Sequence, residues 1–557
     1  MTEIVTNARA TADYRARERA LAAAASLPVE PTGEVAFHSR GRLLVVGPME
    51  QAIEFASELV DTDLRPAVLA LESPQPLSSA VAVPVLFSAG REVRAAGHLG
   101  AFRVTVRDVD AEIDVASALD RNCQRLDLVV DLGQPPLFQQ EVPPLGYFPA
   151  ADAGARARVR EQLPELVGEF VKPRYFHYVA DVCAHGRSGL QGCRRCLDAC
   201  PTEAIVSLGE RIEVDPNLCQ GAGICATACP TGAIGYSYPN RHDLGNRLRA
   251  LLRAYREAGG REAVLLLHDG ECGAELLRQA AEQLPAHIIP IEIEELGSVG
   301  PEVWLSCLAY GAARVMLLDA GNLPRSVDAE LEAQLATVHM VLEGLGYPAP
   351  TVAKVTPSDG AELARAASEV AMPELAPAGF AIPADKREAL FLAIDHLTEQ
   401  TSANHHDVIE LGRGAAFGEI LVDTTTCTLC MSCVSVCPAR ALADGVDRPL
   451  LALIEKNCVQ CGLCETACPE HAITRHPRLL LEAQARARPR TLHQEAPFQC
   501  ILCGKPFATA SMIGRMTEKL AGHHMFQNED ALRRLKMCGD CRVKDLFESE
   551  RSKTSEP

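Results

Sequence analysis

The sequence lacks long apolar runs, and this absence excludes several classes of protein. No stretch of the 557 residues approaches the roughly 18 consecutive apolar residues that a helix needs to cross a bilayer, so we expect no membrane span. Residues 1–23 are too rich in charge for a secretory signal, because Arg9, Arg15 and Glu18 fall among them. The sequence therefore predicts a cytoplasmic protein.

Positive charge is scarce as well. Lys and Arg together number 54 against 73 Asp and Glu, which leaves a formal net charge of −19. Binding to nucleic acid needs a basic footprint, so the composition argues against a nucleic-acid partner. Protein partners and redox chemistry remain open.

The sequence also lacks the patterns that self-contained enzymes carry. Neither a nucleophile–base constellation nor a phosphate-binding loop is recognisable, so we assign no catalytic residue. The strand expected at 43–47 ends in a single glycine, Gly47, where a dinucleotide site needs a glycine-rich turn so that the backbone can approach a pyrophosphate. Binding of FAD or a nicotinamide is therefore not favoured, and whether the protein is an enzyme stays open.

Cysteine, in contrast, is abundant, with 22 residues. Thiols stay reduced in the cytoplasm, so this number favours metal binding over disulfides. Two tandem runs, at 427–438 and 458–469, read Cys-x-x-Cys-x-x-Cys-x-x-x-Cys-Pro, the spacing with which bacterial ferredoxins hold [4Fe-4S] clusters. Each cubane needs four thiolates, and the last cysteine of each run serves the other cluster. We therefore predict two [4Fe-4S] clusters on the ligand sets Cys427, Cys430, Cys433, Cys468 and Cys437, Cys458, Cys461, Cys464.

A second region repeats this pattern with two departures. Leu190 stands where the first cysteine belongs, with Cys183 seven residues earlier as its replacement, and Ala222 stands at a position where alanine cannot ligate iron. The same crossing rule predicts one [4Fe-4S] cluster on Cys183, Cys193, Cys196 and Cys229. It leaves three thiolates for a [3Fe-4S] cluster, or for a [4Fe-4S] cluster with one labile iron, on Cys200, Cys219 and Cys225. An empty site with structural cysteines stays open, as does ligation by His185.

The C-terminal part carries two Cys-x-x-Cys pairs. Their separation fits a structural zinc ion held tetrahedrally by four thiolates. Zinc has no redox role, so it would fold this part of the chain and carry no electrons. A single iron in the same cage is the alternative. The predicted ligands are Cys500, Cys503, Cys538 and Cys541.

Apolar segments outside the cysteine motifs alternate with helical patterns. One parallel sheet is predicted from strands at 43–47, 67–71 and 126–133 with a helix at 52–60. A second is predicted from strands at 263–267, 287–291 and 314–318 with helices at 274–282 and 301–310. Further helices are expected at 153–170 and 386–397.

The predicted fold class is α/β plus α+β and multidomain, with two dicluster ferredoxin-like modules inserted among Rossmann-like α/β domains and a C-terminal zinc-ribbon-like domain. The expected domains are a helical or partly disordered lead at 1–40, a degenerate Rossmann-like domain at 41–150, a modified dicluster module at 171–240, an α/β domain at 260–375, a complete dicluster module at 416–480 and a four-cysteine zinc-binding domain at 496–548.

These motifs resemble known families. The stretch from Pro173 through Cys183 to Asp198 resembles multi-cluster proteins that are encoded beside formate dehydrogenases and are related to the A-type subunit of heterodisulfide reductase. Residues 262–347 are similar to the small delta subunit of methyl-viologen-reducing hydrogenase, although Ala320-Gly321-Asn322 stands where a cysteine-rich turn would be expected. That resemblance implies the fold and puts the [2Fe-2S] cofactor in doubt. The N-terminal unit resembles part of a flavin domain without its glycine fingerprint.

Together these features predict an electron-transfer protein that relays single electrons between partner oxidoreductases, as one component of a complex rather than as a self-contained enzyme. The resemblance implies a formate dehydrogenase or a heterodisulfide-reductase-like complex as partner. Two alternatives stay open. One is a flavin-containing reductase subunit with its own catalytic site at 42–133, and the other is a zinc-bearing assembly scaffold for a redox complex.

Overall fold

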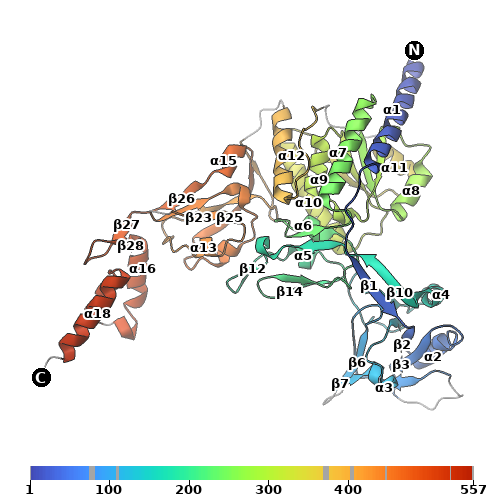
Figure 1. Ribbon diagram of the computed structural model, residues 1–557, viewed down its shortest axis with the longest axis horizontal. Helices are drawn as coiled ribbons and strands as arrows, with labels where there is room; N and C mark the ends of the chain where they lie inside the picture. The colour runs from blue at the N-terminus through green and yellow to red at the C-terminus, as the bar shows by residue number, and fades with distance from the viewer. Residues whose placement is uncertain are drawn as a thin grey trace.

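The structure is a computed structural model that describes residues 2–73, 82–107, 112–367, 375–401, 407–445, 448–526 and 528–554. It is a mixed α/β chain of several units (Figure 1). An N-terminal α/β unit lies at the lower right of the figure and a second α/β unit at the upper right, with one cysteine-rich region between them and another to the left. Every helix within the described ranges is too short or too polar to serve as a membrane span.

The first α/β unit is built on a five-stranded parallel sheet in the order β4-β3-β2-β8-β9. Its central strands are apolar and buried on both faces, as parallel strands usually are. Helix α2 packs on one face, whereas the antiparallel sheet β5-β6-β7 covers the other face, where a doubly wound fold would carry helices. The elements are β2 (Arg42–Gly47), α2 (Met49–Ser57), β3 (Arg65–Ala70), β4 (Val85–Phe87), β5 (Glu92–Ala96), β6 (Arg103–Arg107), β7 (Glu112–Asp114), α3 (Val115–Leu119), β8 (Leu128–Asp131) and β9 (Tyr147–Pro149).

The second α/β unit has a four-stranded parallel sheet in the order β18-β17-β19-β20. Its first three strands and the helices between them confirm the segments expected from sequence. Strand β20 and helix α10 were not anticipated. The elements are β17 (Val264–His268), α8 (Cys272–Ala280), β18 (Ile288–Glu292), η3 (Leu296–Ser298), α9 (Pro301–Ala309), β19 (Arg314–Leu318), α10 (Arg325–Gly344), η4 (Ala349–Thr351), β20 (Val352–Val355) and α11 (Gly360–Ala367).

The N-terminal lead is an integral part of the fold. Helix α1 (Thr2–Ala25) packs on α7 (Arg241–Glu257), and the alanines Ala16, Ala20 and Ala24, four residues apart, join the core of the second α/β unit. After the helix, β1 (Glu34–Ser39) pairs antiparallel with β10 (Gly168–Pro173). The lead therefore connects the two α/β units.

The helix expected at 153–170 is wrong in its second half. Helix α4 (Ala153–Gln162) ends early and is followed by the 3₁₀ turn η1 (Leu163–Leu166) and then by β10. The physical reason is Pro164, which has no backbone N–H to donate to a carbonyl one turn earlier and therefore cannot continue the α-helix.

Two cysteine-rich modules repeat one arrangement of short elements. In module I (residues 176–236), β11 (Phe176–Tyr178) pairs antiparallel with β16 (Ile234–Tyr236) on either side of the cysteine runs. In module II (residues 408–494), β22 (Gly418–Val422) and β25 (Ile473–Leu480) pair antiparallel in the same way. Each also has an internal hairpin and two one-turn helices, so the internal repeat is confirmed. The remaining elements are η2 (Ala180–Val182), β12 (Gly186–Arg187), β13 (Leu190–Gln191), α5 (Arg195–Asp198), β14 (Ile205–Ser207), β15 (Ile212–Val214), α6 (Ile224–Ala228), β21 (Val408–Glu410), α13 (Ser432–Ser435), β23 (Leu442–Asp444), β24 (Leu450–Leu453), η5 (Glu455–Asn457), α14 (Leu463–Thr466), α15 (Ala483–Ala487) and β26 (Arg490–Gln494).

Helix α12 (Lys386–Gln400) leads from the second α/β unit to module II, and a C-terminal unit follows module II (Figure 1). The C-terminal unit consists of a short hairpin and three α-helices. The first Cys-x-x-Cys pair lies in the hairpin loop, and the second lies at the start of the last helix. Its elements are β27 (Pro497–Gln499), β28 (Pro506–Thr509), α16 (Ala510–Leu520), η6 (His524–Phe526), α17 (Glu529–Arg534) and α18 (Gly539–Thr554).

Replacing Ala20 by leucine is expected to destabilise the fold, because Ala20 is fully buried in the core that also contains Trp304. Overpacking of this kind costs about 1–3 kcal/mol of the free energy of unfolding. Arg19→Leu, on the exposed side of the same helix, is the matched control. Denaturant unfolding followed by the fluorescence of Trp304, the single tryptophan, measures both variants. An equal loss of stability in the two would contradict this packing of α1.

Candidate functional site

The cysteine loops of both modules share tight turns at residues with left-handed backbone conformation. Beyond each Cys-Pro pair, the third residue after the cysteine has a left-handed φ: Glu203 (51°), Gly232 (72°), Arg440 (51°) and His471 (50°). Non-glycine residues rarely adopt this conformation, so its recurrence marks a constrained turn. In module II the turn lets the next backbone N–H, of Ala441 or Ala472, donate to the sulfur of Cys437 or Cys468 at 3.2 and 3.3 Å.

The three-cysteine runs are wound in the same way. In module II, Leu429 and Met431 have φ of 54° and 61°, and Gln460 and Gly462 have φ of 55° and 87°. Burial raises the pKa of the Cys427 and Cys458 thiols, and hydrogen bonds from the backbone of Leu429 and Gln460 oppose this shift. These amides point at sulfur because the left-handed residues turn the chain around it. The arrangement stabilises thiolates.

The thiols gather in four sets, which we number in their spatial order. Set 1 is Cys200, Cys219 and Cys225; set 2 is Cys183, Cys193, Cys196 and Cys229; set 3 is Cys437, Cys458, Cys461 and Cys464; and set 4 is Cys427, Cys430, Cys433 and Cys468. In module II each set lines its own cavity. The sets are the crossed groups that the spacing predicts.

Module I shows its grouping through the charges around two central thiols. Burial raises the pKa of Cys196, and the nearby thiolates of Cys229, Cys193 and Cys183 raise it further. Burial likewise raises the pKa of Cys225, and the nearby thiolates of Cys219 and Cys200 raise it further. Cys183 therefore belongs to set 2 despite its distance in sequence from the other members.

The incomplete run of set 1 keeps the backbone of a complete one. Gly221 and Gly223 have φ of 87° and 69°, like the residues that flank the central cysteine in module II. The backbone of Gly221 also hydrogen-bonds the Cys219 thiol, whose pKa burial raises. Ala222, in place of the cysteine, packs against the core of the second α/β unit. A Cβ built on Gly297 of η3 would come within 2.4 Å of the Ala222 carbonyl, so this side of the loop is closely covered.

His185 is a loop-stabilising residue. Its Nδ1 lies 2.8 Å from the Cys193 carbonyl oxygen and its Nε2 lies 2.7 Å from the Ser207 hydroxyl. Both ring nitrogens are engaged and the residue is buried, so neither nitrogen is available to ligate iron.

Lys172 is a neighbour of set 1 that sequence reasoning missed. Its Nζ donates to the carbonyl oxygens of Asn217 and Cys219 at 2.9 and 2.7 Å. Burial lowers its pKa to about 8, and the thiolate of Cys219 opposes this shift. A lysine followed by proline in a half-polar strand gives no sign of this role, because the partner carbonyls lie more than 40 residues away.

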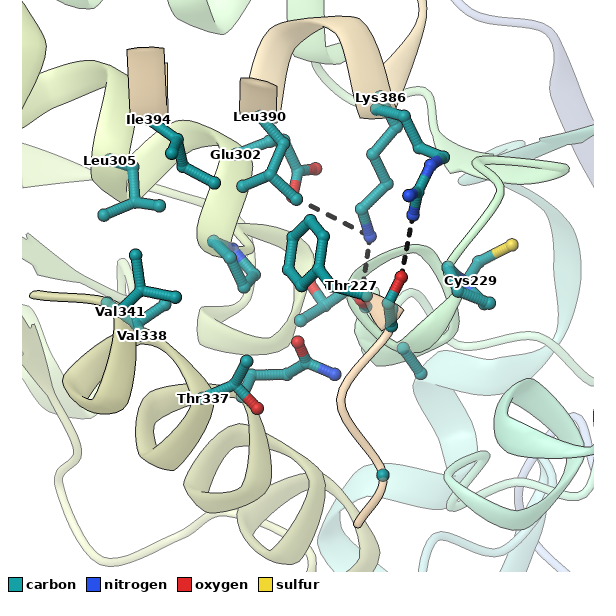
Figure 2. A pocket seen from close by; sticks show the side chains of 18 of the residues that line it. Thr227, Cys229, Glu302, Leu305, Thr337, Val338, Val341, Lys386, Leu390 and Ile394 are labelled. Atoms are coloured by element: carbon teal, nitrogen blue, oxygen red, sulfur yellow. Dashed lines mark hydrogen bonds and ion pairs between the residues drawn. The ribbon is translucent and has the colours of Figure 1, made fainter. Parts of the chain in front are cut away.

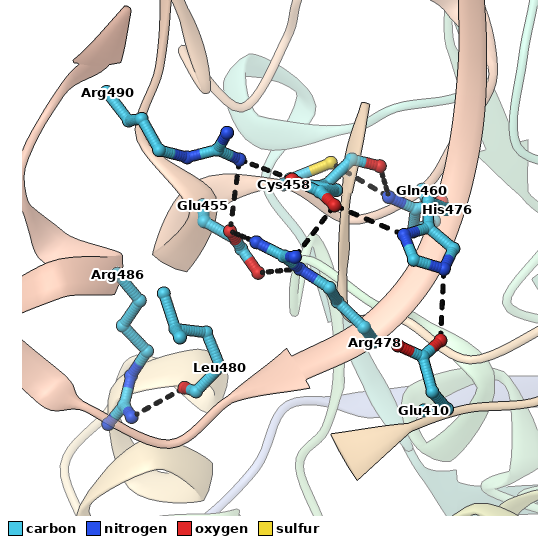
Figure 3. Close-up of polar contacts among 10 residues, drawn as sticks. Glu410, Glu455, Cys458, Gln460, His476, Arg478, Leu480, Arg486 and Arg490 are labelled. Carbon is cyan, nitrogen blue, oxygen red and sulfur yellow. Dashed lines mark hydrogen bonds and ion pairs between the residues drawn. The ribbon is translucent and has the colours of Figure 1, made fainter. Parts of the chain in front are cut away.

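An ionic network supports set 3 beneath the Cys458 loop (Figure 3). Arg478 pairs with the Glu455 carboxylate at 2.8 Å and with the Glu419 carboxylate at 2.7 Å, and both carboxylates are buried. Gln460 donates to the Glu419 carbonyl oxygen at 2.8 Å and to the Cys458 sulfur at 3.4 Å. The network therefore ties strand β25 to the segment that carries the cysteine.

The core of each module consists of apolar side chains and cysteine thiols packed together. Burial disfavours the thiolate, and it raises the pKa of Cys461 to about 11 and that of Cys433 to about 12. A bound cationic metal centre removes this penalty, because a coordinating thiol is deprotonated. The donor set, the cavities of module II and the inward amides all fit iron–sulfur clusters.

The two modules meet at sets 2 and 3. A Cβ built on Gly192, beside Cys193, would come within 2.7 Å of the Leu463 side chain, and Arg195 donates to the Gly414 carbonyl oxygen at 2.5 Å. Burial raises the pKa of Cys461, and the Cys193 thiolate is among the charges that add to this shift. The sets therefore adjoin across the module boundary.

The C-terminal cysteines converge on a compact cage. The sulfurs of Cys500, Cys503, Cys538 and Cys541 all lie within 4.8 Å of one another. The Cys503 and Cys538 sulfurs are 3.7 Å apart, close to the edge of about 3.8 Å in a tetrahedron with metal–sulfur distances of about 2.3 Å. Although burial opposes the shift, backbone hydrogen bonds from Cys503, Cys538 and Leu502 lower the pKa of Cys500 to about 6. The cage fits a four-thiolate metal site.

Removing the His185 side chain is expected to lower stability and leave iron content unchanged. His185→Ala removes two hydrogen bonds of a buried ring, at a cost of about 0.5–1.5 kcal/mol each. Thermal unfolding and iron analysis on the same sample measure the two effects, and His185→Gln, which keeps an amide donor and acceptor, is the control. A loss of about four iron atoms with preserved folding would instead identify the histidine as a ligand.

Comparison with known families agrees with this geometry. Residues 191–233 match a family model described as a 4Fe-4S dicluster domain, and residues 426–473 match a second model with the same description. No curated protein matches the chain. The chain is thus a multi-cluster 4Fe-4S protein with two ferredoxin-type domains, and its role is iron–sulfur electron transfer.

Proposed function

We propose that the chain relays single electrons between a donor and an acceptor oxidoreductase, with the cysteines of sets 1 to 4 as ligands of four clusters. When bound, the clusters supply one-electron chemistry over their iron and sulfide atoms. The protein supplies their order, their burial and the amides and charges around them.

The contact between the modules carries this proposal. Cys196 of set 2 neighbours Cys225 of set 1, Cys193 of set 2 neighbours Cys461 of set 3, and Cys433 of set 4 neighbours Cys464 of set 3. At each of these steps one thiolate acts on the pKa of a thiol in the next set, which supports a row that runs from set 1 to set 4. A relay needs such continuity, whereas a protein that only stores clusters does not.

Set 1 would hold a [3Fe-4S] cluster or a [4Fe-4S] cluster with one labile iron. The wound loop and the Gly221 amide support a filled site, because structural cysteines alone would not need them. Lys172 adds a positive charge beside Cys219. Both features stabilise negative charge at the end of the row.

The C-terminal cage would hold zinc as a structural ion, with a single iron as the alternative. The unit that it would fold borders set 4. The Thr509 hydroxyl donates to the Thr428 carbonyl oxygen, beside Cys427, at 2.9 Å, and Lys519 pairs with Glu470 at 2.8 Å. A zinc-ribbon-like unit at this place would shield the outer end of the row and form part of a docking surface.

The partners follow from the resemblance to the A-type subunit of heterodisulfide reductase and to the hydrogenase delta subunit. We propose a cytoplasmic complex with a formate dehydrogenase or a heterodisulfide-reductase-like enzyme. The two Rossmann-like units at 41–150 and 260–375 would serve as frames around module I. Exchange at the two ends of the row would then involve different partner proteins.

Metal analysis tests the proposal. Protein purified without oxygen is expected to contain about 15 or 16 iron, about 16 acid-labile sulfide and about one zinc per chain. About eight iron would mean that one module is filled and would contradict a row of four. Iron near zero would refute electron transfer by this chain.

Ala222→Cys is expected to complete set 1, because residue 222 occupies the position of a cysteine in the complete runs. If set 1 holds three irons, the iron content rises by about one per chain and the electron paramagnetic resonance (EPR) signal of an oxidised [3Fe-4S] cluster disappears. Ala222→Ser has a similar volume and is the control. The same iron content and spectrum in the wild type and in both folded variants would contradict a three-iron cluster at this site.

A further inference from the structure

Helix α12 begins with two adjacent cations that reach different modules. Asp385 caps the helix by accepting a hydrogen bond from the backbone N–H of Glu388. From the first turn, Lys386 extends to module I and Arg387 extends to module II. Neither residue belongs to a motif that is recognisable in the sequence.

Lys386 brings a buried positive charge to set 2. Its Nζ donates to the carbonyl oxygens of Ala226 and Thr227 at 2.6 and 2.7 Å and lies 3.7 Å from the Glu302 carboxylate (Figure 2). The two carbonyl oxygens accept hydrogen bonds, whereas the carboxylate lies beyond hydrogen-bond distance and acts on the ammonium group through its charge. The carbonyls belong to α6, which ends next to Cys229 of set 2.

The charge of Lys386 is only partly compensated. Glu302 also accepts from Arg241 at 3.0 Å, so two cations share one carboxylate. Burial lowers the pKa of Lys386, while the charges of Glu302 and Cys229 oppose this shift. The group of three side chains carries a net positive charge beside set 2.

Arg387 does the same for set 3. Its guanidinium donates to the carbonyl oxygens of Lys456, Ala416 and Cys458 at 2.7, 2.9 and 3.1 Å. It also lies against two phenylalanine rings at 5.2 and 5.5 Å from their centroids. Within the described part of the chain, no carboxylate forms an ion pair with Arg387. The Asp385 carboxylate acts on Arg387 only through space, so no directly bonded carboxylate neutralises the cation beside the loop of Cys458, a member of set 3.

We propose that Lys386 and Arg387 are positioning residues that hold the modules together and raise the reduction potentials at sets 2 and 3, so that the start of α12 controls the electron step between the modules. This inference rests on the proposed relay. A fixed positive charge in a low-dielectric interior stabilises the additional negative charge of a reduced site, which raises its potential. The step itself moves one electron from set 2 to set 3 or back, with no bond formed or broken.

The test compares midpoint potentials from EPR-monitored redox titrations of the full chain. Arg387→Met removes the charge, and Arg387→Lys keeps it. Arg486→Met is the matched control, because Arg486 also packs on the Phe391 ring, at 4.6 Å from its centroid, and donates to backbone carbonyls. These carbonyls belong to Leu480 (Figure 3) and Leu481 and not to a cysteine loop, and Arg486 pairs with Asp395. For set 2, Lys386→Met removes the cation and leaves Glu302 paired with Arg241, and Lys386→Arg keeps the cation.

Arg387→Met is expected to shift one midpoint potential downward by at least about 59 mV, a tenfold change in a one-electron equilibrium. Arg387→Lys and Arg486→Met should leave that potential within a third of this shift. If Arg387→Met loses iron, Arg387→Gln, which keeps amide donors toward the carbonyls without the charge, takes its place. Lys386→Met is likewise expected to shift one midpoint potential downward, and Lys386→Arg should leave that potential within a third of the shift.

Unchanged potentials in charge-free variants with full iron content would overturn the inference and leave the relay intact. An equal shift in Arg486→Met would also overturn it, because the cause would then be a general loss of packing. A wild-type protein with fewer than four reducible clusters would instead fail the proposed relay, and the two failures are therefore distinguishable.

Discussion

The thiols of both modules lie in cores that they share with apolar side chains. Burial makes the thiolate unfavourable there, and cationic metal centres are what would make these cores stable. The left-handed turns, the inward amides and the ionic network of Glu419 and Glu455 all serve to hold sulfur at fixed positions. The fold of each module and its chemistry therefore depend on one requirement, the neutralisation of buried thiolates.

The rest of the chain arranges these modules. The second α/β unit covers set 1 through η3 and places Glu302 beside Lys386, while α12 contacts both modules from its first turn. Helix α1 and the β1–β10 pair connect the first α/β unit to this frame. The large units thus surround the modules and contact them at several points.

The sequence was sufficient to predict the local features. Cysteine spacing indicated the two dicluster regions, which the family models match, and the strand predicted at 314–318 is observed as Arg314–Leu318, because both signals lie in short stretches of sequence. Features that depend on distant contacts could not be predicted. The contacts of Lys386 and Arg387 require carbonyls of both modules. The sheet β5-β6-β7 covers a face where a doubly wound fold would carry helices. Pro164 ends a helix that we predicted to continue to residue 170.

The central claim is a continuous row of four sets across two modules. A reductive titration of anoxic protein followed by EPR tests it most directly, because it counts the electrons taken up and detects magnetic interaction between neighbouring reduced clusters. The account predicts about four electrons per chain and a fully reduced spectrum broadened by interaction between the modules. Two electrons per chain, or a spectrum equal to the sum of two independent modules, would contradict it.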